Sequence, residues 1–270
     1  MVGGERLSAT VTRVLAPNPS LMTLSGTNTY LVGEDELVVI DPGPDLPEHL
    51  EAIVAAAARL GRVALSCVTH HHADHLPAAV KLRERLGVPI AGHRDLPHVD
   101  RPLGDEQLIE VTGAQLRAIA TPGHTADHLC YLLESERALF TGDLIAGSGT
   151  VIVGDGRGEL AQYIASLRRV EELLPRVILP GHGPAVEDAA AKIREYLEHR
   201  LGRECQIMRL LERGPRTVRE IVGELYAEVP SGLHEMAARN VRAHLWKLED
   251  ERRAQATGER WYLVDGGETA

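Results

Sequence analysis

Four of the 13 histidines in this 270-residue chain lie within six consecutive positions, in the sequence THHHADH (residues 69–75). The segment before them, VALSCVT (63–69), is an apolar run typical of a buried strand. The segment after them, HLPAAVKLRERLG (75–87), has the apolar spacing of a helix that ends at a glycine. The histidines therefore lie at the carboxyl end of a strand, where α/β folds gather their functional side chains.

The same arrangement recurs at three more places in the chain. Strand-like runs lead directly into His124 (LRAIATPGHT), Asp143 (ALFTGD) and His182 (VILPGHG). Further strands are expected at 29–33, 37–41 and 129–134, and further helices at 46–61 and 159–174. These patterns predict an α/β fold with both hairpins and crossovers.

The pattern changes after residue 186, and the rest of the chain is expected to be mostly helical. Helices are predicted at 187–213, at 217–227 with Thr217 and Glu220 as a capping box, and at 233–251. The run RWYLVD (260–265) follows a glycine turn and is expected to close a short hairpin. Three helices and a hairpin describe a winged-helix module, so we expect a first domain over 1–186 and a second over 187–270.

Composition limits the possible functions. No run of 18 apolar residues and no signal-peptide pattern is present, so we expect a cytoplasmic protein without a membrane partner. The net charge of -10 argues against a surface that neutralises phosphates over the whole protein, although a local basic patch remains possible. Three widely spaced cysteines argue against a thiolate zinc site, and we expect them to be buried.

Seven imidazole and carboxylate side chains follow these strands, and they are expected to converge on metal: His70, His72, Asp74, His75, His124, Asp143 and His182. Nitrogen and oxygen ligands without thiolate suit zinc, iron or manganese. His70 and His72 point the same way from an extended segment, because side chains alternate with period two. Asp74 and His75 are expected to face a second metal. Two metals that share a carboxylate and a hydroxide would form a hydrolytic centre.

These motifs, with NTYLVG and VVIDPG upstream, resemble the metallo-β-lactamase superfamily, whose signature is H-x-H-x-D-H followed by a distant His, Asp and His. The resemblance implies an αββα sandwich that binds two divalent ions, zinc first, with manganese or iron as alternatives. It places His70, His72 and His124 on the first metal. It places Asp74, His75 and His182 on the second, with Asp143 as the bridge and Asp74 and Asp143 as catalytic residues.

The resemblance also narrows the reaction. True β-lactamases of the best-known zinc class carry a cysteine at the place of Asp143, so an aspartate there favours the glyoxalase-II-like and nuclease-like branches. Residues 158–174, 179–200 and 233–249 resemble the β-lactamase-like-protein-2 group of endoribonucleases, which adds a winged helix to this fold. This implies hydrolysis of single-stranded RNA by a metal-bridging hydroxide, with Asp74 or a metal-bound water protonating the leaving oxygen.

Two alternatives stay open. Related proteins include acyl-carrier-protein thioesterases, so the substrate is an acyl thioester in the second hypothesis. In the third, the winged helix binds nucleic acid and the metal site is vestigial. Five basic residues could form a stripe that binds RNA, or they could simply lie on solvated helix faces. They are Arg168, Arg169, Arg239, Arg242 and Lys247. The oligomeric state is not predicted.

Three further residues are candidates for support or substrate contact. Asp41, which ends LVVID, is expected to hold a metal ligand. His128 is expected either to orient a ligand or to touch substrate, and Asn28 to line the rim of the site. His71 lies between two ligands and is expected to point away from them.

Overall fold

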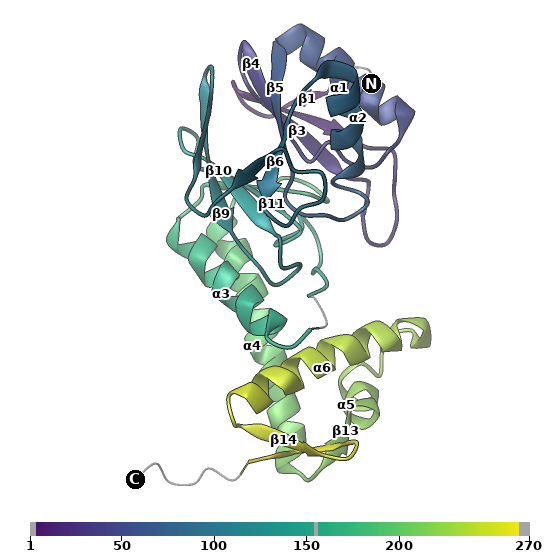
Figure 1. Ribbon diagram of the computed structural model, residues 1–270. Helices are drawn as coiled ribbons and strands as arrows, with labels where there is room; N and C mark the ends of the chain where they lie inside the picture. Colours follow the sequence, from purple (N-terminus) through teal and green to yellow (C-terminus); the bar gives the residue numbers. More distant parts are fainter. Residues whose placement is uncertain (1–3, 154–155, 265–270) are drawn as a thin grey trace.

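The computed structural model describes residues 4–153 and 156–264, which form two lobes joined by a long helix (Figure 1). The first lobe contains a seven-stranded sheet in the order β1-β2-β3-β4-β5-β6-β7 and a five-stranded sheet in the order β12-β11-β10-β9-β8. The strands of the first sheet are β1 (Glu5–Arg6), β2 (Val11–Leu15), β3 (Asn28–Gly33), β4 (Glu36–Ile40), β5 (Arg62–Cys67), β6 (Ile90–His93) and β7 (Arg101–Leu103). Those of the second are β8 (Leu108–Val111), β9 (Ala114–Ala120), β10 (Leu129–Leu133), β11 (Ala138–Gly142) and β12 (Val177–Pro180).

The two sheets pack face to face, and helices cover their outer faces. Alternate residues of β3 show the division, because Tyr30 and Val32 enter the core between the sheets while Leu31 packs outward. Helix α1 (Pro47–Leu60) covers the first sheet with α2 (Pro77–Leu86), and α3 (Glu159–Glu172) covers the second. This confirms the expected αββα sandwich.

Every strand and helix expected from the sequence is present, and several short strands were not anticipated. Strands β2, β6, β7 and β8 contain only three to five residues each. The expected strand β12 is as short but is a continuous apolar run, whereas Arg, Gly, Pro or Glu interrupts the apolar residues of these four strands. Pairing with neighbouring strands therefore decides their conformation.

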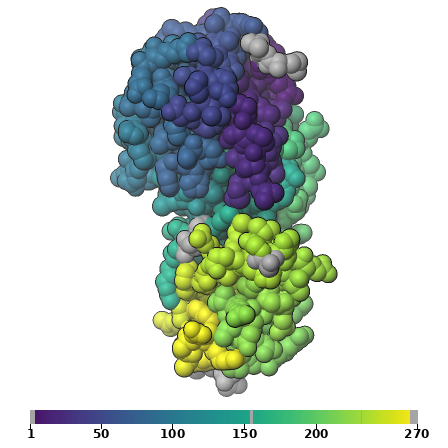
Figure 2. All heavy atoms as spheres, turned by 90° about the vertical axis from the view of Figure 1, so that its right-hand side faces the viewer, coloured from purple at the N-terminus to yellow at the C-terminus, as the bar shows by residue number. Residues whose placement is uncertain are grey.

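Helix α4 (Ala189–Glu212) belongs to two cores. Its first half places Ile193 and Tyr196 in the apolar cluster beneath the second sheet, and its second half places Ile207 and Leu211 in the core of the C-terminal lobe. The division expected at residue 186 therefore falls just before a helix that both lobes share. Figure 2 shows the C-terminal lobe, in green and yellow, meeting the first lobe at a narrow waist.

The C-terminal lobe is the expected winged helix. Helix α5 (Val218–Leu225) begins with the predicted capping box, in which Thr217 and Glu220 bond to each other's backbone N–H groups. A short 3-10 turn, η1 (Ser231–Leu233), leads into α6 (His234–Asp250). Strand β13 (Arg216–Thr217) pairs with β15 (Arg260–Leu263), which pairs with β14 (Ala254–Thr257).

The structure tests two expectations from composition, which concern membrane-spanning helices and the burial of the cysteines. Within the described residues, no helix is long and apolar enough to cross a membrane. Cys67 and Cys130 are buried as expected, but the expectation is wrong for Cys205, which is exposed. Cys205 lies on α4 between the two cores, where one face of the helix is left to solvent.

Candidate metal centre

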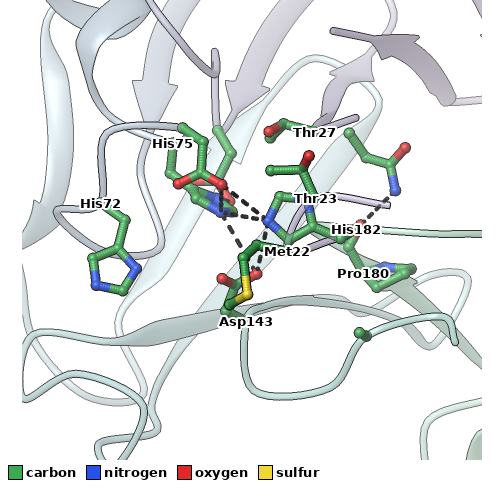
Figure 3. A network of polar contacts seen from close by, with 12 residues as sticks. Met22, Thr23, Thr27, His72, His75, Asp143, Pro180 and His182 are labelled. Atoms are coloured by element: carbon green, nitrogen blue, oxygen red, sulfur yellow. Dashed lines mark hydrogen bonds and ion pairs between the residues drawn. The ribbon is translucent and has the colours of Figure 1, made fainter. Parts of the chain in front are cut away.

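The predicted ligands converge at one edge of the sandwich, where loops from both sheets meet. Figure 3 shows four of them, which are His72, His75, Asp143 and His182. The loop after β5 carries His70, His72, Asp74 and His75. The loops after β9, β11 and β12 carry the remaining three, which are His124, Asp143 and His182. Four strand ends thus place all seven side chains together, as their positions in the sequence predict.

The first cluster consists of His70, His72, His124 and Asp143, whose ligand atoms lie within 4.8 Å of one another. His72 Nδ1 lies 2.9 Å from His70 Nε2 and 3.2 Å from His124 Nε2. His70 is fully buried and His124 nearly so, whereas His72 opens to the pocket.

The second cluster consists of Asp74, His75 and His182, again within 4.8 Å. His182 Nε2 lies 3.3 Å from His75 Nε2 and 3.2 Å from Asp74 Oδ2. Both rings are buried, and the carboxylate is partly exposed.

Asp143 lies between the clusters. Its Oδ2 is 3.5 Å from His124 Nε2, and its Oδ1 is 3.3 Å from His182 Nε2. Oδ1 is buried and has no hydrogen-bond partner among the described residues. One carboxylate that turns an oxygen to each cluster has the arrangement of a bridging ligand.

The hydrogen bonds that the ligand histidines make on the side away from the clusters indicate what the nitrogens facing the clusters can bind. His124 Nδ1 donates to Ile152 O at 2.7 Å, and His75 Nδ1 donates to Asp41 Oδ2 at 2.8 Å. Each ring therefore donates a proton from its outer Nδ1, which leaves the inward-facing Nε2 as the atom that would bind a cation. Several lone pairs within 3.3 Å repel one another unless a cation lies among them, so the donor set fits a metal ion in each cluster.

Asp41 supports both clusters. Besides the hydrogen bond from His75, Asp41 Oδ2 accepts one from the Thr69 hydroxyl at 2.8 Å, and its Oδ1 accepts one from the Thr69 backbone N–H at 2.7 Å. Because the hydroxyl proton of Thr69 is used in this way, its oxygen is left to accept from His70 Nδ1 at 2.9 Å. Asp41 thus orients one histidine of each cluster. Sequence reasoning singled out Asp41 and missed Thr69, although Thr69 is adjacent to the histidine run.

His128 lies behind Asp143 and is not among the residues that line the pocket. Its Nδ1 donates to Thr121 Oγ1 at 2.8 Å, and its Nε2 accepts the backbone N–H of Asp143 at 3.2 Å. Burial lowers the pKa of His128 to about 3, so the ring is neutral and can accept that proton. Of the two roles considered from sequence, the geometry fits orientation of Asp143.

Asn28 lies beneath the site, not at its rim. The side chain is buried and donates to Pro180 O at 2.9 Å and to Gly183 O at 2.8 Å. It thereby holds the PGHG loop that carries His182. A side chain that has to satisfy two carbonyls inside the protein is not available to substrate.

His71 points away from the clusters, as expected. Its side chain is 49% exposed, and its Nδ1 lies 2.9 Å from Asp127 Oδ1. The period-two argument from sequence therefore separates His71 correctly from its two neighbours.

A pocket of about 280 Å³ opens over both clusters. Its lining includes five of the seven predicted ligands together with Met22, Ile152, Val153 and Arg239. Figure 3 shows Met22 beside Asp143 and His182. Sequence reasoning missed the three apolar residues, because no local motif marks them. Arg239 comes from α6 of the winged helix, so both lobes form the wall.

Comparison with known proteins agrees with this geometry. Residues 22–182 match the Metallo-beta-lactamase superfamily, and residues 217–261 match the Beta-lactamase associated winged helix domain. The Beta-lactamase-like protein 2 homolog of Caenorhabditis elegans is 36% identical over 90% of this chain and 85% of its own length. The Atrochrysone carboxyl ACP thioesterase of Aspergillus chevalieri is 34% identical over 96% of this chain and 89% of its own length.

Solved structures share the arrangement of both lobes. A metallo-beta-lactamase family protein from Thermus thermophilus superposes with a TM-score of 0.80 over 96% of this chain and all of its own, at 23% identity. A beta-lactamase domain protein from Burkholderia ambifaria superposes with a TM-score of 0.84 over 97% of this chain and 94% of its own, at 18% identity. The chain belongs to the metallo-β-lactamase superfamily and carries that family's associated winged helix.

Proposed function

We propose that this metallo-β-lactamase-fold hydrolase holds two divalent ions and cleaves an acyl thioester. When bound, the ions would polarise the substrate carbonyl and lower the pKa of water. The first ion would be held by His70, His72 and His124, the second by Asp74, His75 and His182, and both by Asp143. Zinc suits this donor set best, with manganese and iron as alternatives.

The apolar wall of the pocket supports the thioester. Met22, Ile152 and Val153 lie directly beside the candidate ligands, so an apolar chain can lie against them while its carbonyl reaches the metal centre. This is the observation that carries the proposal. The similarity to a protein named as an ACP thioesterase points the same way.

The distribution of charge supports it as well. RNA binding needs a positive track, because each phosphate contact releases counterions. Of the basic stripe considered from sequence, Arg169 pairs with Asp105 at 2.8 Å, and Lys247 pairs with Glu204 at 2.8 Å. Arg242 is likewise paired, with a glutamate on its own helix. The stripe is therefore largely neutralised.

Single-stranded RNA is the second candidate, and one observation favours it. Arg239 lines the same pocket as His72 and Asp74, so a guanidinium lies within reach of one phosphate near the centre. The similarity to the Beta-lactamase-like protein 2 homolog agrees with the endoribonuclease resemblance of the sequence.

The two candidate substrates differ in whether their leaving group needs a proton from Asp74. Its carboxylate is 27% exposed and faces the pocket, where it can hold a proton for a leaving group. A thiolate leaves with little protonation, since the pKa of a thiol is about 8.5, whereas a ribose alkoxide needs a proton. We therefore propose that Asp74 serves mainly to hold the second ion and that Asp143 joins the two ions.

A paired assay tests the proposal. Zinc-loaded and manganese-loaded protein would be given an acyl-pantetheine thioester and single-stranded RNA, at low and moderate salt, with His72→Ala as the control. We expect thioester cleavage that is insensitive to salt and absent in the control. RNA cleavage that disappears in His72→Ala, without thioester cleavage, would transfer the assignment to the endoribonuclease. Nucleic-acid binding without either reaction would support the third hypothesis, in which the winged helix binds nucleic acid and the metal site is vestigial.

A further inference from the structure

Arg200, on α4, is buried at the junction of the two lobes and is 1% exposed. Its Nη2 donates to Val151 O at 2.6 Å and to Thr150 Oγ1 at 3.1 Å. Its Nη1 reaches Asn240 Oδ1, on α6 of the winged helix, at 3.4 Å. One guanidinium thus joins a loop of the first lobe to a helix of the second.

No carboxylate pairs with Arg200 among residues 4–153 and 156–264. The ring of Tyr163 lies under the guanidinium, 5.2 Å from Cζ to the ring centroid. A buried cation is costly unless hydrogen bonds and nearby π-electrons compensate it. Here the hydrogen bonds come from the Val151 carbonyl and from the side chains of Thr150 and Asn240, so the guanidinium holds the loop at 150–151 against α6.

The next residue of that loop contacts the first metal cluster. Ile152, directly after Val151, accepts the Nδ1 proton of His124 at 2.7 Å. The same segment supplies Ile152 and Val153 to the pocket wall. The carbonyl that sets the tautomer and ring angle of His124 is therefore adjacent to the carbonyl that Arg200 holds.

We propose that Arg200 is a positioning residue through which the winged helix sets the orientation of His124, and with it the affinity of the first metal site. The proposal rests on the metal site proposed above and is independent of the substrate. It gives the C-terminal lobe a role at the metal centre besides forming part of the pocket wall.

The second cluster is held from within the first lobe. His75 donates to Asp41, and His182 Nδ1 faces Gly26 O at 3.4 Å, so neither partner belongs to α4. Loss of a partner that orients a metal-bound histidine typically lowers metal affinity about 10- to 100-fold. Loss of Arg200 should therefore weaken the first site and leave the second nearly unchanged.

Arg203 offers a matched control on the same helix. It lies one turn further along α4, with its Cζ 4.3 Å from the ring centroid of Tyr226 and its Nη1 3.4 Å from Leu225 O. Both contacts lie inside the C-terminal lobe. Arg203→Met therefore removes a guanidinium and a ring contact without touching the loop at 150–153.

The experiment measures zinc binding to the full chain by competition with a chromophoric chelator, in the wild type and in Arg200→Met, Arg200→Lys and Arg203→Met. His124→Ala and His182→Ala assign the two binding steps to the two sites. We expect Arg200→Met to lower the affinity of the first site at least about tenfold and that of the second less than about threefold. Arg200→Lys should restore part of the loss, because its ammonium can reach one carbonyl. Arg203→Met should match the wild type.

Unfolding of the metal-free proteins shows whether each variant is folded, and if Arg200→Met is not, Arg200→Lys and Asn240→Ala carry the test. Equal losses at both sites, unchanged affinities, or the same loss in Arg203→Met would overturn the proposal while leaving the proposed function intact. A wild-type chain that binds no metal would overturn the proposed function first, and this proposal with it.

Discussion

Asp41 accepts a hydrogen bond from His75 Nδ1 at 2.8 Å, and both side chains are buried. The backbone of Asp41 has a φ of 47°, in the left-handed region that residues other than glycine rarely adopt. This conformation lets the carboxylate, at the end of β4, reach the loop after β5. A conformation of this kind costs on the order of 1 kcal/mol, which the fold sustains where the side chain holds functional groups.

We predict that Asp41→Asn lowers metal affinity at both sites, at least about tenfold at each. The amide oxygen of asparagine carries less negative charge than a carboxylate oxygen, so it accepts hydrogen bonds from Thr69 and His75 more weakly. The NH₂ group of the amide would also face a hydrogen-bond donor. Metal competition measures the effect, and Asp45→Asn, at an exposed position nearby, is the control. Loss at one site only would show that the relay from Asp41 through Thr69 to His70 does not operate.

We predict that the protein binds about two divalent ions per chain, because seven donors in two clusters exceed what one tetrahedral ion requires. Elemental analysis after purification without chelators measures the ratio. Removal of metal should lower the melting temperature by several degrees, since ligands that bind only the folded state stabilise it by about 4 kcal/mol at a thousandfold excess over Kd. Metal-free protein with full hydrolytic activity would contradict the assignment.

We predict opposite outcomes for two neighbouring histidines. His72→Ala should lower kcat/KM at least about 100-fold, because His72 lies in the first cluster and lines the pocket. His71→Ala should retain activity within about threefold, because it removes only a half-exposed contact with Asp127. Steady-state kinetics on one metal-loaded preparation of each protein makes the comparison. Equal losses would mean that the wrong ring had been assigned to the metal.

We predict that the C-terminal lobe loses stability below about pH 4.5, through Glu204. Burial alone would raise the pKa of Glu204, but His244 at 4.0 Å and Lys247 at 2.8 Å lower it to about 2. A carboxyl group whose pKa is lowered on folding stabilises the folded state above its unfolded pKa of 4.5. That contribution is lost as the pH falls towards 2.

Glu204→Gln tests this. The variant should be less stable than the wild type at pH 7 by about 2 kcal/mol, because it removes the charge that pairs with Lys247 and Arg253. The difference should shrink as the pH falls from about 5 to about 2.5, measured by urea unfolding. Glu212→Gln, on the same helix, controls for the general titration of carboxylates. A difference that is constant with pH would rule out Glu204 as the titrating group.

Much of the candidate centre follows from sequence because its geometry is local. His70, His72, Asp74 and His75 share one loop, so their spacing alone determines which side chains point together. The remaining ligands each follow a strand that reads clearly as apolar, and strand ends gather at one edge of a sandwich whatever the details of its loops. The capping box at Thr217 is predictable for the same reason, because its two residues lie three positions apart in the sequence.

Other features depend on how distant segments pack. Met22, Ile152 and Arg239 meet in one pocket although they are widely separated in sequence, and Asn28, expected at the rim, is buried under the PGHG loop. The link from Arg200 to His124 needs the two lobes to dock through α4. The chain's local patterns determined the strands, the helix ends and the ligand set, since these depend on neighbours a few residues away. Only the tertiary structure decided which apolar and basic side chains surround the ligands, because those contacts arise from the packing of one sheet, loop or lobe against another.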